Sequence, residues 1–530
     1  MKNFWKNRKK EILIALFILS FAAFLRIYKL TYLPIFADEA IYIRWSQVMR
    51  AEPGLRFLPL SDGKQPLFMW VTIPFLKLIA DPLFAARIVS ALAGLGTLVG
   101  IFMLSYLLFK SRRAALFASF IYAISPFSVF FDKMALVDSM LSFFGVWTLV
   151  FSVITVKKVR LDAAMLSGFF LGGAILTKSP GIFFAILLPL TLTLHKWPKK
   201  WKEKFNSLSV FVFLFAFTYL IAFAMHSIQR LGPNFHMIAI RNKDYVYPLS
   251  HILESPLNPL VPFLKDIFGY FWLLGPAVLI IMFLVGVYYG LKEKRKEALL
   301  LLAWAIFPLL VVAEYSTTMT ARYIYFTLPY LFIIVAYTFK DSLPAQAGRT
   351  MQLARKFLII LFVGQALFID FQLLTDIEKV TLPRSERSGY LEEWTAGYGI
   401  KESADLIREE FVKDPDKKIV VGTEGYFGTL PDGLQIYLND LSAITVIGVG
   451  LDLTEIPKSL SESKKSGNKT YLVINDSRLR ADSDALGLKV VAAYPKAFRK
   501  EGTREYNTLG PRETLYLFEV VGKSVEKRDI

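Results

Sequence analysis

The sequence predicts an α-helical membrane protein that crosses the bilayer many times and ends in a water-soluble α/β domain. The 530 residues are 54% hydrophobic with a mean hydropathy of +0.44, which is too apolar for a soluble chain of this length. Long apolar runs recur up to about residue 374, and the composition becomes polar from about residue 380. The Lys and Arg residues gather in alternate connections between the runs, as they do in membrane proteins.

The first apolar run, residues 12–28, follows a basic N-terminus. It continues past a weak cleavage match at Ser20-Phe21-Ala22, which favours an uncleaved first span over a signal peptide. Ten more runs bring the expected number of spans to about 11. They lie at about 83–109, 114–131, 139–156, 163–177, 180–195, 206–227, 266–290, 298–313, 323–339 and 357–374.

The distribution of basic residues supports this arrangement. With a cytoplasmic N-terminus, the inner connections (1–10, 110–113, 157–160, 196–204, 292–296 and 340–356) hold 24 Lys and Arg in 49 residues. The outer connections (30–66, 132–138, 177–180, 228–265 and 314–322) hold 11 in 95. We therefore predict a multi-pass protein of the cell (plasma) membrane with an extracytoplasmic C-terminal domain.

Two segments are ambiguous from hydropathy alone. Residues 67–80 are apolar but much shorter than a span of roughly 20 residues, so we expect an interfacial or re-entrant helix. Residues 163–195 are interrupted by Thr177-Lys178-Ser179-Pro180-Gly181. One span there would place the lysines at 196–204 outside, so we expect two short helices that meet at an outer turn.

The outer loop at 30–82 carries two adjacent carboxylates, Asp38 and Glu39. The segment after them places four apolar residues, Ile41, Trp45, Val48 and Met49, on one helical face, which is typical of a helix lying in the membrane surface. An ordinary amphipathic connector would show the same pattern. Either interpretation places the carboxylate pair at the outer interface.

We expect residues 1–379 to form the transmembrane domain and residues 380–530 to form a soluble α/β domain. In the latter, Ile400, Ala404, Ile407 and Phe411 share one helical face. Strand-like runs follow at 418–422, 444–449, 470–474, 489–493 and 514–521.

Composition also excludes several kinds of chemistry. The chain has no cysteine, so it has neither a thiolate site nor a disulfide framework, and four histidines make a histidine-rich metal centre unfavourable. The net charge of +18 follows membrane topology, so we expect no nucleic-acid partner. Ionisable groups in or beside the spans fall near expected outer ends. A transporter would be expected to place some near the midplane, so this pattern favours a reaction centre at the outer leaflet.

Five motifs carry a resemblance to a known family. In order along the chain they are Asp38-Glu39-Ala40, Lys64-Gln65-Pro66-Leu67-Phe68-Met69-Trp70, Ala86-Arg87-Ile88, Leu176-Thr177-Lys178-Ser179-Pro180 and Arg322-Tyr323-Ile324-Tyr325. Over about residues 10–335 the set resembles the polytopic glycosyltransferases of the C-type fold (GT-C), in the protein O-mannosyltransferase and aminoarabinose-transferase group. The C-terminal domain carries no family signature.

The resemblance implies an inverting transfer of a sugar from a polyprenyl-phosphate donor to an acceptor hydroxyl on the outer face. It implies that Asp38 is the general base and that Glu39 orients Asp38 or the acceptor, or helps to bind a metal. Cations must bind the departing phosphate, and the candidates are Lys64, Lys178 and Arg322, with Arg87 and Lys133 behind them. Asp138 is the other acidic candidate. The acceptor is a protein, a lipid or a glycan, and membrane lipid surrounds the site.

The chain departs from the family in two places. The family often has Lys-Pro-Pro where this chain has Lys64-Gln65-Pro66, and it commonly has Arg where this chain has Lys133. Lysine keeps the charge but loses the bidentate grip on phosphate. We expect no required cofactor, although the carboxylates are compatible with a divalent metal. The alternatives are a lipid or solute transporter with an external binding domain, and oligosaccharide transfer to asparagine, whose Trp-Trp-Asp signature is absent.

Overall fold

The computed structural model describes residues 2–338 and 349–522, and the chain divides into two compact units. The first unit comprises Met1–Leu30, Glu52–Thr72 and Arg87–Pro383. The second comprises Thr31–Ala51, Ile73–Ala86 and Arg384–Ile530. Two pieces of the chain from the region of the outer loop 30–82, which we expected in the transmembrane domain, therefore group with the C-terminal residues.

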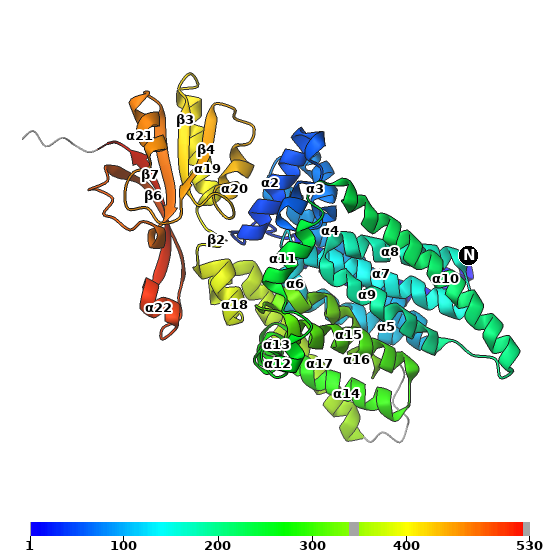
Figure 1. The fold of residues 1–530 in the computed structure, drawn as a ribbon. Helices are drawn as coiled ribbons and strands as arrows, with labels where there is room; N and C mark the ends of the chain where they lie inside the picture. Colours follow the sequence, from blue (N-terminus) through cyan, green and yellow to red (C-terminus); the bar gives the residue numbers. More distant parts are fainter. Residues whose placement is uncertain (1, 339–348, 523–530) are drawn as a thin grey trace, which may run out of the picture. The chain divides into compact units, whose positions relative to one another are not determined.

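The first unit is built from helices (Figure 1). They are α1 (Lys2–Ile27), α4 (Pro82–Phe109, which starts in the second unit), α5 (Arg112–Ile124), α6 (Pro126–Asp132), α7 (Val137–Lys158), α8 (Leu161–Thr177), α9 (Ile182–Leu187), α10 (Trp201–Ser227), α11 (Met237–Tyr245), α12 (His251–Glu254), α13 (Leu260–Leu274), α14 (Val278–Lys292), α15 (Lys296–Tyr315), α16 (Leu328–Tyr337) and α17 (Arg349–Thr375). In the described part of the chain, five helices are long and apolar enough to cross a membrane, or up to seven if each of two bent pairs is one span. The chain is therefore a multi-pass membrane protein.

Two predicted spans are broken helices rather than continuous ones. The run at 114–131 forms α5 and α6, which meet at an angle of 60° at Ser125-Pro126. The run at 266–290 forms α13 and α14, which meet at 110° around Pro276. A proline has no N–H for the helical hydrogen bond and its ring clashes with the preceding turn, so each helix ends before the proline.

Both ambiguous segments form short helices, and the second is interrupted where predicted. Residues Leu67–Leu78 form α3, a helix of 12 residues. Helix α8 ends at Thr177, Lys178 is extended, and a 3₁₀ turn at Ser179–Gly181 leads into α9 and a further 3₁₀ segment at Leu188–Leu194. A Cβ atom on Gly181 would lie 2.6 Å from the backbone carbon of Ala174, so only glycine fits the inside of this turn.

A buried ion pair joins α1 to α6. The Nε atom of Arg26 donates to Oδ2 of Asp132 at 2.8 Å, and both side chains are fully buried. The hydroxyls of Tyr122 and Tyr325 donate to the same carboxylate at 3.0 and 2.7 Å. Gly94 leaves room for this carboxylate, because a Cβ atom there would lie 2.1 Å from Oδ2. These hydrogen bonds offset the free-energy cost of burying the charges of Arg26 and Asp132 inside the first unit.

Asp132→Ala is expected to lower the free energy of unfolding by about 3–5 kcal/mol, because it leaves Arg26 charged, buried and without its carboxylate. The measurement is equilibrium unfolding of the purified protein in detergent. The matched control is Asp162→Ala, which removes the partner of Arg160 from an exposed pair and is expected to leave the free energy of unfolding nearly unchanged. Equal losses for the two variants would contradict this account.

The second unit contains a five-stranded sheet of order β4-β3-β5-β7-β6 (Figure 1). The strands are β3 (Ile419–Glu424), β4 (Ile444–Gly450), β5 (Lys469–Asn475), β6 (Leu488–Phe498) and β7 (Arg512–Val520). The first three are parallel, and β7 pairs antiparallel with both β5 and β6. All five predicted strands are confirmed in place, as is the predicted helix, α19 (Ile400–Lys413).

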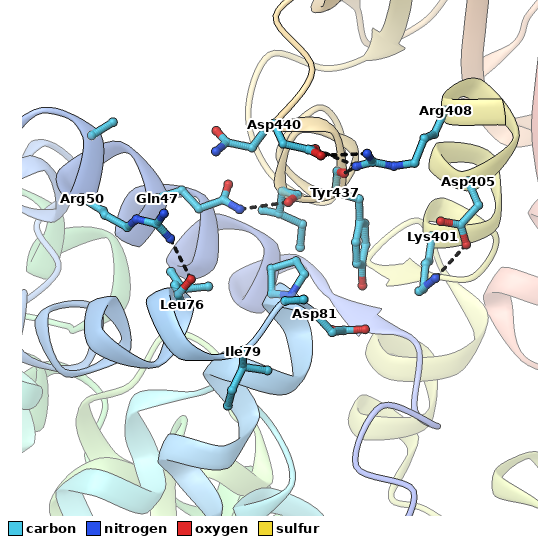
Figure 2. Close-up of a pocket in the computed structure, with 15 residues that line it drawn as sticks. Gln47, Arg50, Leu76, Ile79, Asp81, Lys401, Asp405, Arg408, Tyr437 and Asp440 are labelled. Carbon is cyan, nitrogen blue, oxygen red and sulfur yellow. Dashed lines mark hydrogen bonds and ion pairs between the residues drawn. The ribbon is translucent and has the colours of Figure 1, made fainter. Parts of the chain in front are cut away.

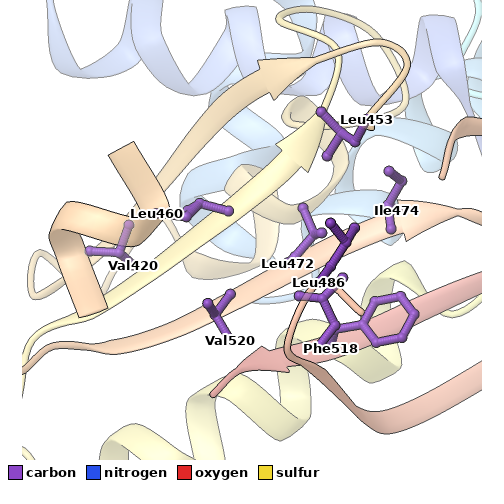
Figure 3. Close-up of a cluster of buried hydrophobic side chains, with 9 residues drawn as sticks. Val420, Leu453, Leu460, Leu472, Ile474, Leu486, Phe518 and Val520 are labelled. Atoms are coloured by element: carbon purple, nitrogen blue, oxygen red, sulfur yellow. The ribbon is translucent and has the colours of Figure 1, made fainter. Parts of the chain in front are cut away.

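The remaining helices of this unit are α18 (Arg384–Arg387), α20 (Asp432–Leu438), α21 (Lys458–Lys465) and α22 (Arg504–Leu509). Leu460 of α21 packs on one face of the sheet against Val420, Leu472 and Phe518, in a larger buried apolar cluster (Figure 3). Side chains alternate along a strand, so Ile419 and Val421 point to the opposite face, and they too are buried. Strand β3, in the parallel part of the sheet, is thus buried on both faces.

Helix α2 (Ala37–Ala51) corrects one interpretation. On the apolar face expected to lie on lipid, Ile41, Trp45 and Met49 are at most 8% exposed and so are buried in protein, and Val48 is partly buried. The polar face carries contacts instead: Gln47 donates to the carbonyl of Ile436 at 2.9 Å, and Arg44 donates to Asn439 at 2.6 Å. The apolar residues of α2 are therefore buried in protein, and its polar residues bind the end of α20. This supports an amphipathic connector rather than a helix lying in the membrane surface.

Candidate active site

Asp38 and Glu39 occupy the first turn of α2 but have different environments. Glu39 is fully buried, and its Oε2 accepts a hydrogen bond of 2.9 Å from the backbone N–H of Phe36. Phe36 immediately precedes the helix and Glu39 is its third residue, so this bond is half of a capping box. Asp38 is only half-buried. Of the two carboxylates, Asp38 is therefore the more accessible to a reactant.

The C-terminal residues hold this carboxylate pair in place. Strand β1 (Ile35–Phe36) pairs antiparallel with β2 (Ala396–Gly397), and Ala37 N–H donates to the carbonyl of Thr395 at 3.1 Å. The ring of Phe36 lies 4.4 Å from that of Tyr390 between centroids. These contacts are all within the second unit. The start of α2 is therefore fixed by residues more than 350 positions further along the chain.

A second group of predicted residues meets in the first unit. The ammonium group of Lys178 donates to Oδ1 of Asp138 at 2.7 Å and lies 5.1 Å from the centre of the Tyr323 ring. Arg322 is next to that tyrosine in sequence, and its guanidinium lies 5.7 Å from the same ring. Two predicted cations, Lys178 and Arg322, therefore lie beside one aromatic side chain, and Asp138 binds the first of them.

Lys64 joins this group through its neighbour. Gln65 donates to the hydroxyl of Ser179 at 2.8 Å, which links the Lys64 motif to the Lys178 motif. The ammonium group of Lys64 lies 4.8 Å from the centre of the Tyr245 ring in α11. Gly63 makes this turn possible, because its φ is +67° and a Cβ atom would lie 2.7 Å from that of Arg241. We call Lys64, Asp138, Lys178 and Arg322 the cationic cluster.

Asp138 neutralises only part of the cluster. It lies in the first turn of α7, where a carboxylate is favoured by the helix dipole, and it is 2% exposed. One oxygen binds Lys178, while Oδ2 has no hydrogen-bond partner among the described residues. An ammonium group has three N–H donors, and Asp138 takes one of those of Lys178. The remaining donors can bind the oxygens of an anion such as phosphate.

Arg87 and Lys133 lie in another environment. Both are almost fully buried, and each donates to a backbone carbonyl just after α1: Arg87 to Leu30 at 3.0 Å and Lys133 to Tyr28 at 2.6 Å. These bonds satisfy carbonyls that the end of a helix leaves unpaired. The geometry therefore gives Arg87 and Lys133 a structural role at this turn. Their assignment to the donor phosphate has no support from these contacts.

The sequence did not indicate two tyrosines beside the cationic cluster, Tyr323 and Tyr245. Tyr323 lies inside a recognised motif, but only its neighbour Arg322 drew attention as a cation. No pattern near Tyr245 in the sequence indicates a binding residue, because its contact with Lys64 forms only when α11 packs beside a segment that is distant in sequence. Among the described residues, no three His, Asp or Glu side chains come together as a group that could hold a metal ion.

Comparison with known proteins agrees with this architecture. Residues 63–222 match the family model of dolichyl-phosphate-mannose-protein mannosyltransferase. This segment includes Lys64, Asp138 and Lys178. No curated protein sequence is similar enough to the chain to count as a match.

Solved structures extend the comparison to the whole chain. ArnT from Cupriavidus metallidurans in the apo state is 16% identical with a TM-score of 0.56, covering 96% of this chain and 97% of that protein. The same enzyme bound to undecaprenyl phosphate is 15% identical with a TM-score of 0.55, covering 96% and 98%. The archaeal oligosaccharyltransferase AglB from Archaeoglobus fulgidus is 13% identical, with a TM-score of 0.48 over 89% of this chain and 70% of that one. The fold of this chain is thus that of a GT-C membrane glycosyltransferase, and the resemblance to that class predicted from its motifs is confirmed.

Proposed function

We propose that the protein transfers a sugar from a polyprenyl-phosphate donor to an acceptor hydroxyl at the outer face of the membrane, with inversion. The observation that carries this proposal is the cationic cluster, in which Lys64, Lys178 and Arg322 come from three separate motifs. A departing phosphate needs fixed cations where its negative charge develops. The undecaprenyl phosphate bound to ArnT supports a polyprenyl donor for this chain of similar fold.

The proposed step is a single displacement. The acceptor oxygen attacks the anomeric carbon from the face opposite the phosphate, and its proton passes to the carboxylate of Asp38. The bond between the anomeric carbon and the phosphate oxygen breaks, and its electron pair leaves with the polyprenyl phosphate. Attack from the opposite face inverts the anomeric centre. A placed base typically contributes about 10²–10⁴-fold to such a step.

The cations act on the leaving group. Lys64, Lys178 and Arg322 bind the phosphate before transfer and stabilise its second negative charge as the bond breaks. Asp138 positions Lys178 rather than reacting itself. In this proposal Glu39 caps α2 and so fixes the direction of Asp38. The reaction as written requires no cofactor.

The test is to incubate the purified protein in lipid nanodiscs with a panel of polyprenyl-phosphate sugars and measure release of polyprenyl phosphate, with and without a metal chelator. One or more donors are expected to release polyprenyl phosphate, at a rate that the chelator leaves unchanged. Failure of every donor, together with movement of a labelled lipid or solute across vesicles, would favour the transporter instead. A loss of activity with chelator would add a divalent metal to the site.

A further inference from the structure

A separate pocket lies inside the second unit (Figure 2). Its volume is about 640 Å³, within the range of small-molecule sites. Four segments line it: the end of α2, the turn 76–82 between α3 and α4, α19, and the end of α20. None of the residues of the proposed transfer step lines this pocket.

The charges around the pocket are balanced. Lys401 binds Asp405 at 2.7 Å, and Arg408 binds both oxygens of Asp440 at 2.6 and 2.7 Å (Figure 2). The hydrogen bond that Lys401 donates to Asp405 raises the pKa of Lys401, and the one that Asp440 accepts from Arg408 lowers the pKa of Asp440, so Lys401 and Asp440 are both charged at neutral pH. Arg50 and Asp81 add one charge of each sign. A strongly charged ligand therefore gains no net attraction here.

Polar and aromatic groups complete the walls and are held in position. Arg50 donates to the carbonyl of Leu76 at 2.7 Å, and the amides of Gln47 and Asn439 are fixed by their bonds to α20 and Arg44. The ring of Tyr437 lines the pocket with the ammonium group of Lys401 6.0 Å from its centre. Walls whose side chains are already fixed lose little entropy when a ligand binds.

We propose that this pocket binds a neutral saccharide unit of the acceptor, at a distance from the hydroxyl that receives the new sugar. A sugar presents many hydroxyls, each both a donor and an acceptor, so it suits walls that offer carboxylates, guanidinium groups and amides together. Its apolar C–H face suits an aromatic ring such as that of Tyr437. This inference rests on the proposed transfer reaction, and it identifies the acceptor as an extended glycan.

Helix α2 supplies the geometric reason for an extended acceptor. It carries Asp38 in its first turn and Arg50, which lines the pocket, in its last. Twelve residues of α-helix at 1.5 Å each separate the two positions by about 18 Å. A molecule that reached both ends must therefore be a chain of several sugars. Binding energy gained in the pocket would then hold the reacting hydroxyl near Asp38, so longer acceptors would react faster.

The first experiment measures binding without transfer. The full-length protein in nanodiscs is titrated with neutral manno- and gluco-oligosaccharides, with a uronic acid and a sugar phosphate as charged probes, and saturation-transfer NMR reports contact. Neutral oligosaccharides are expected to bind, and Tyr437→Ala is expected to weaken binding at least about tenfold by removing the ring. Tyr437→Phe keeps the ring and is expected to retain binding.

The matched control is Tyr426→Ala, which removes an exposed tyrosine that does not line the pocket and is expected to leave binding unchanged. If Tyr437→Ala does not fold, Lys401→Ala at an exposed wall position replaces it. Three outcomes would overturn the inference: no binding of any neutral saccharide, tighter binding of the charged probes, or an equal effect of Tyr426→Ala.

The second experiment separates this inference from the proposed function. Once a donor is known, transfer is measured against acceptors of increasing length. Tyr437→Ala is expected to remove the advantage of long acceptors while short acceptors react as before. If Tyr437→Ala still transferred sugar faster to long acceptors than to short ones, the pocket would not bind the acceptor, and the proposed transfer reaction would be unaffected. Absence of transfer with every donor, combined with saccharide binding, would overturn the transfer reaction alone.

Discussion

Asp38→Asn is expected to lower the turnover number at least about 100-fold while leaving the affinity for the donor almost unchanged. Asparagine has nearly the shape of aspartate but cannot take the proton of the acceptor hydroxyl. The donor phosphate is proposed to bind Lys64, Lys178 and Arg322, so its affinity does not depend on Asp38. The measurements are the rate of sugar transfer at saturating donor and the dissociation constant of the donor.

Glu39→Gln is the control for this variant. Glutamine keeps an oxygen that can accept from Phe36 N–H, so the cap on α2 survives and the turnover number is expected to stay near that of the natural protein. If Asp38→Asn turned over normally, the base would lie elsewhere, and Asp138 would be the first to examine. If Glu39→Gln lost as much activity as Asp38→Asn, Glu39 would take part in the chemistry rather than in capping.

Lys178→Ala is expected to weaken donor binding about 10- to 100-fold and also to lower the turnover number. The phosphate is charged before and during transfer, and a hydrogen bond to a charged group is worth about 1.5–3 kcal/mol. The variant also leaves Asp138 buried beside the phosphate without its 2.7 Å partner, which adds repulsion. Donor binding to the purified protein and steady-state transfer are the two measurements.

Two variants sharpen the interpretation of Lys178→Ala. Asp138→Asn releases Lys178 from its carboxylate, so donor affinity is expected to remain or to increase. Lys199→Ala removes an exposed lysine outside the cluster and is expected to change neither quantity. Normal donor affinity in Lys178→Ala, or equal losses in Lys199→Ala, would show that the phosphate binds elsewhere.

Much of the fold follows from local sequence patterns. The apolar run at 139–156 became α7 (Val137–Lys158), and the strand predicted at 444–449 became β4 (Ile444–Gly450). Such elements form because burial of a continuous or periodic apolar stretch outweighs any local alternative. The spans that contain Pro126 and Pro276 are bent, whereas hydropathy predicted continuous helices. The reason is local: proline lacks the N–H that a continuous helix requires, and hydropathy does not take this into account.

The candidate site was predicted less completely, because a residue type does not determine its contacts. Arg87 and Lys133 are basic residues like Lys64 and Lys178, yet they bind the carbonyls of Leu30 and Tyr28 and are buried. Tyr245 was missed because nothing near it in sequence indicates a cation over its ring. These distinctions depend on which distant groups pack beside each side chain.

The sequence by itself was enough to predict a membrane protein of many helices. It also contained the motifs around Asp38, Lys64, Lys178 and Arg322, which indicated the class of enzyme that the chain resembles. These depend on composition and short-range order, which a linear chain carries directly. Only the tertiary structure decided that Gln65 bonds Ser179, that Glu39 is a buried cap, and that β1 pairs with β2. The first and third of these join segments that are distant in sequence, and the second distinguishes Glu39 from its neighbour Asp38. All three depend on hydrogen bonds whose partners meet only when the chain has folded.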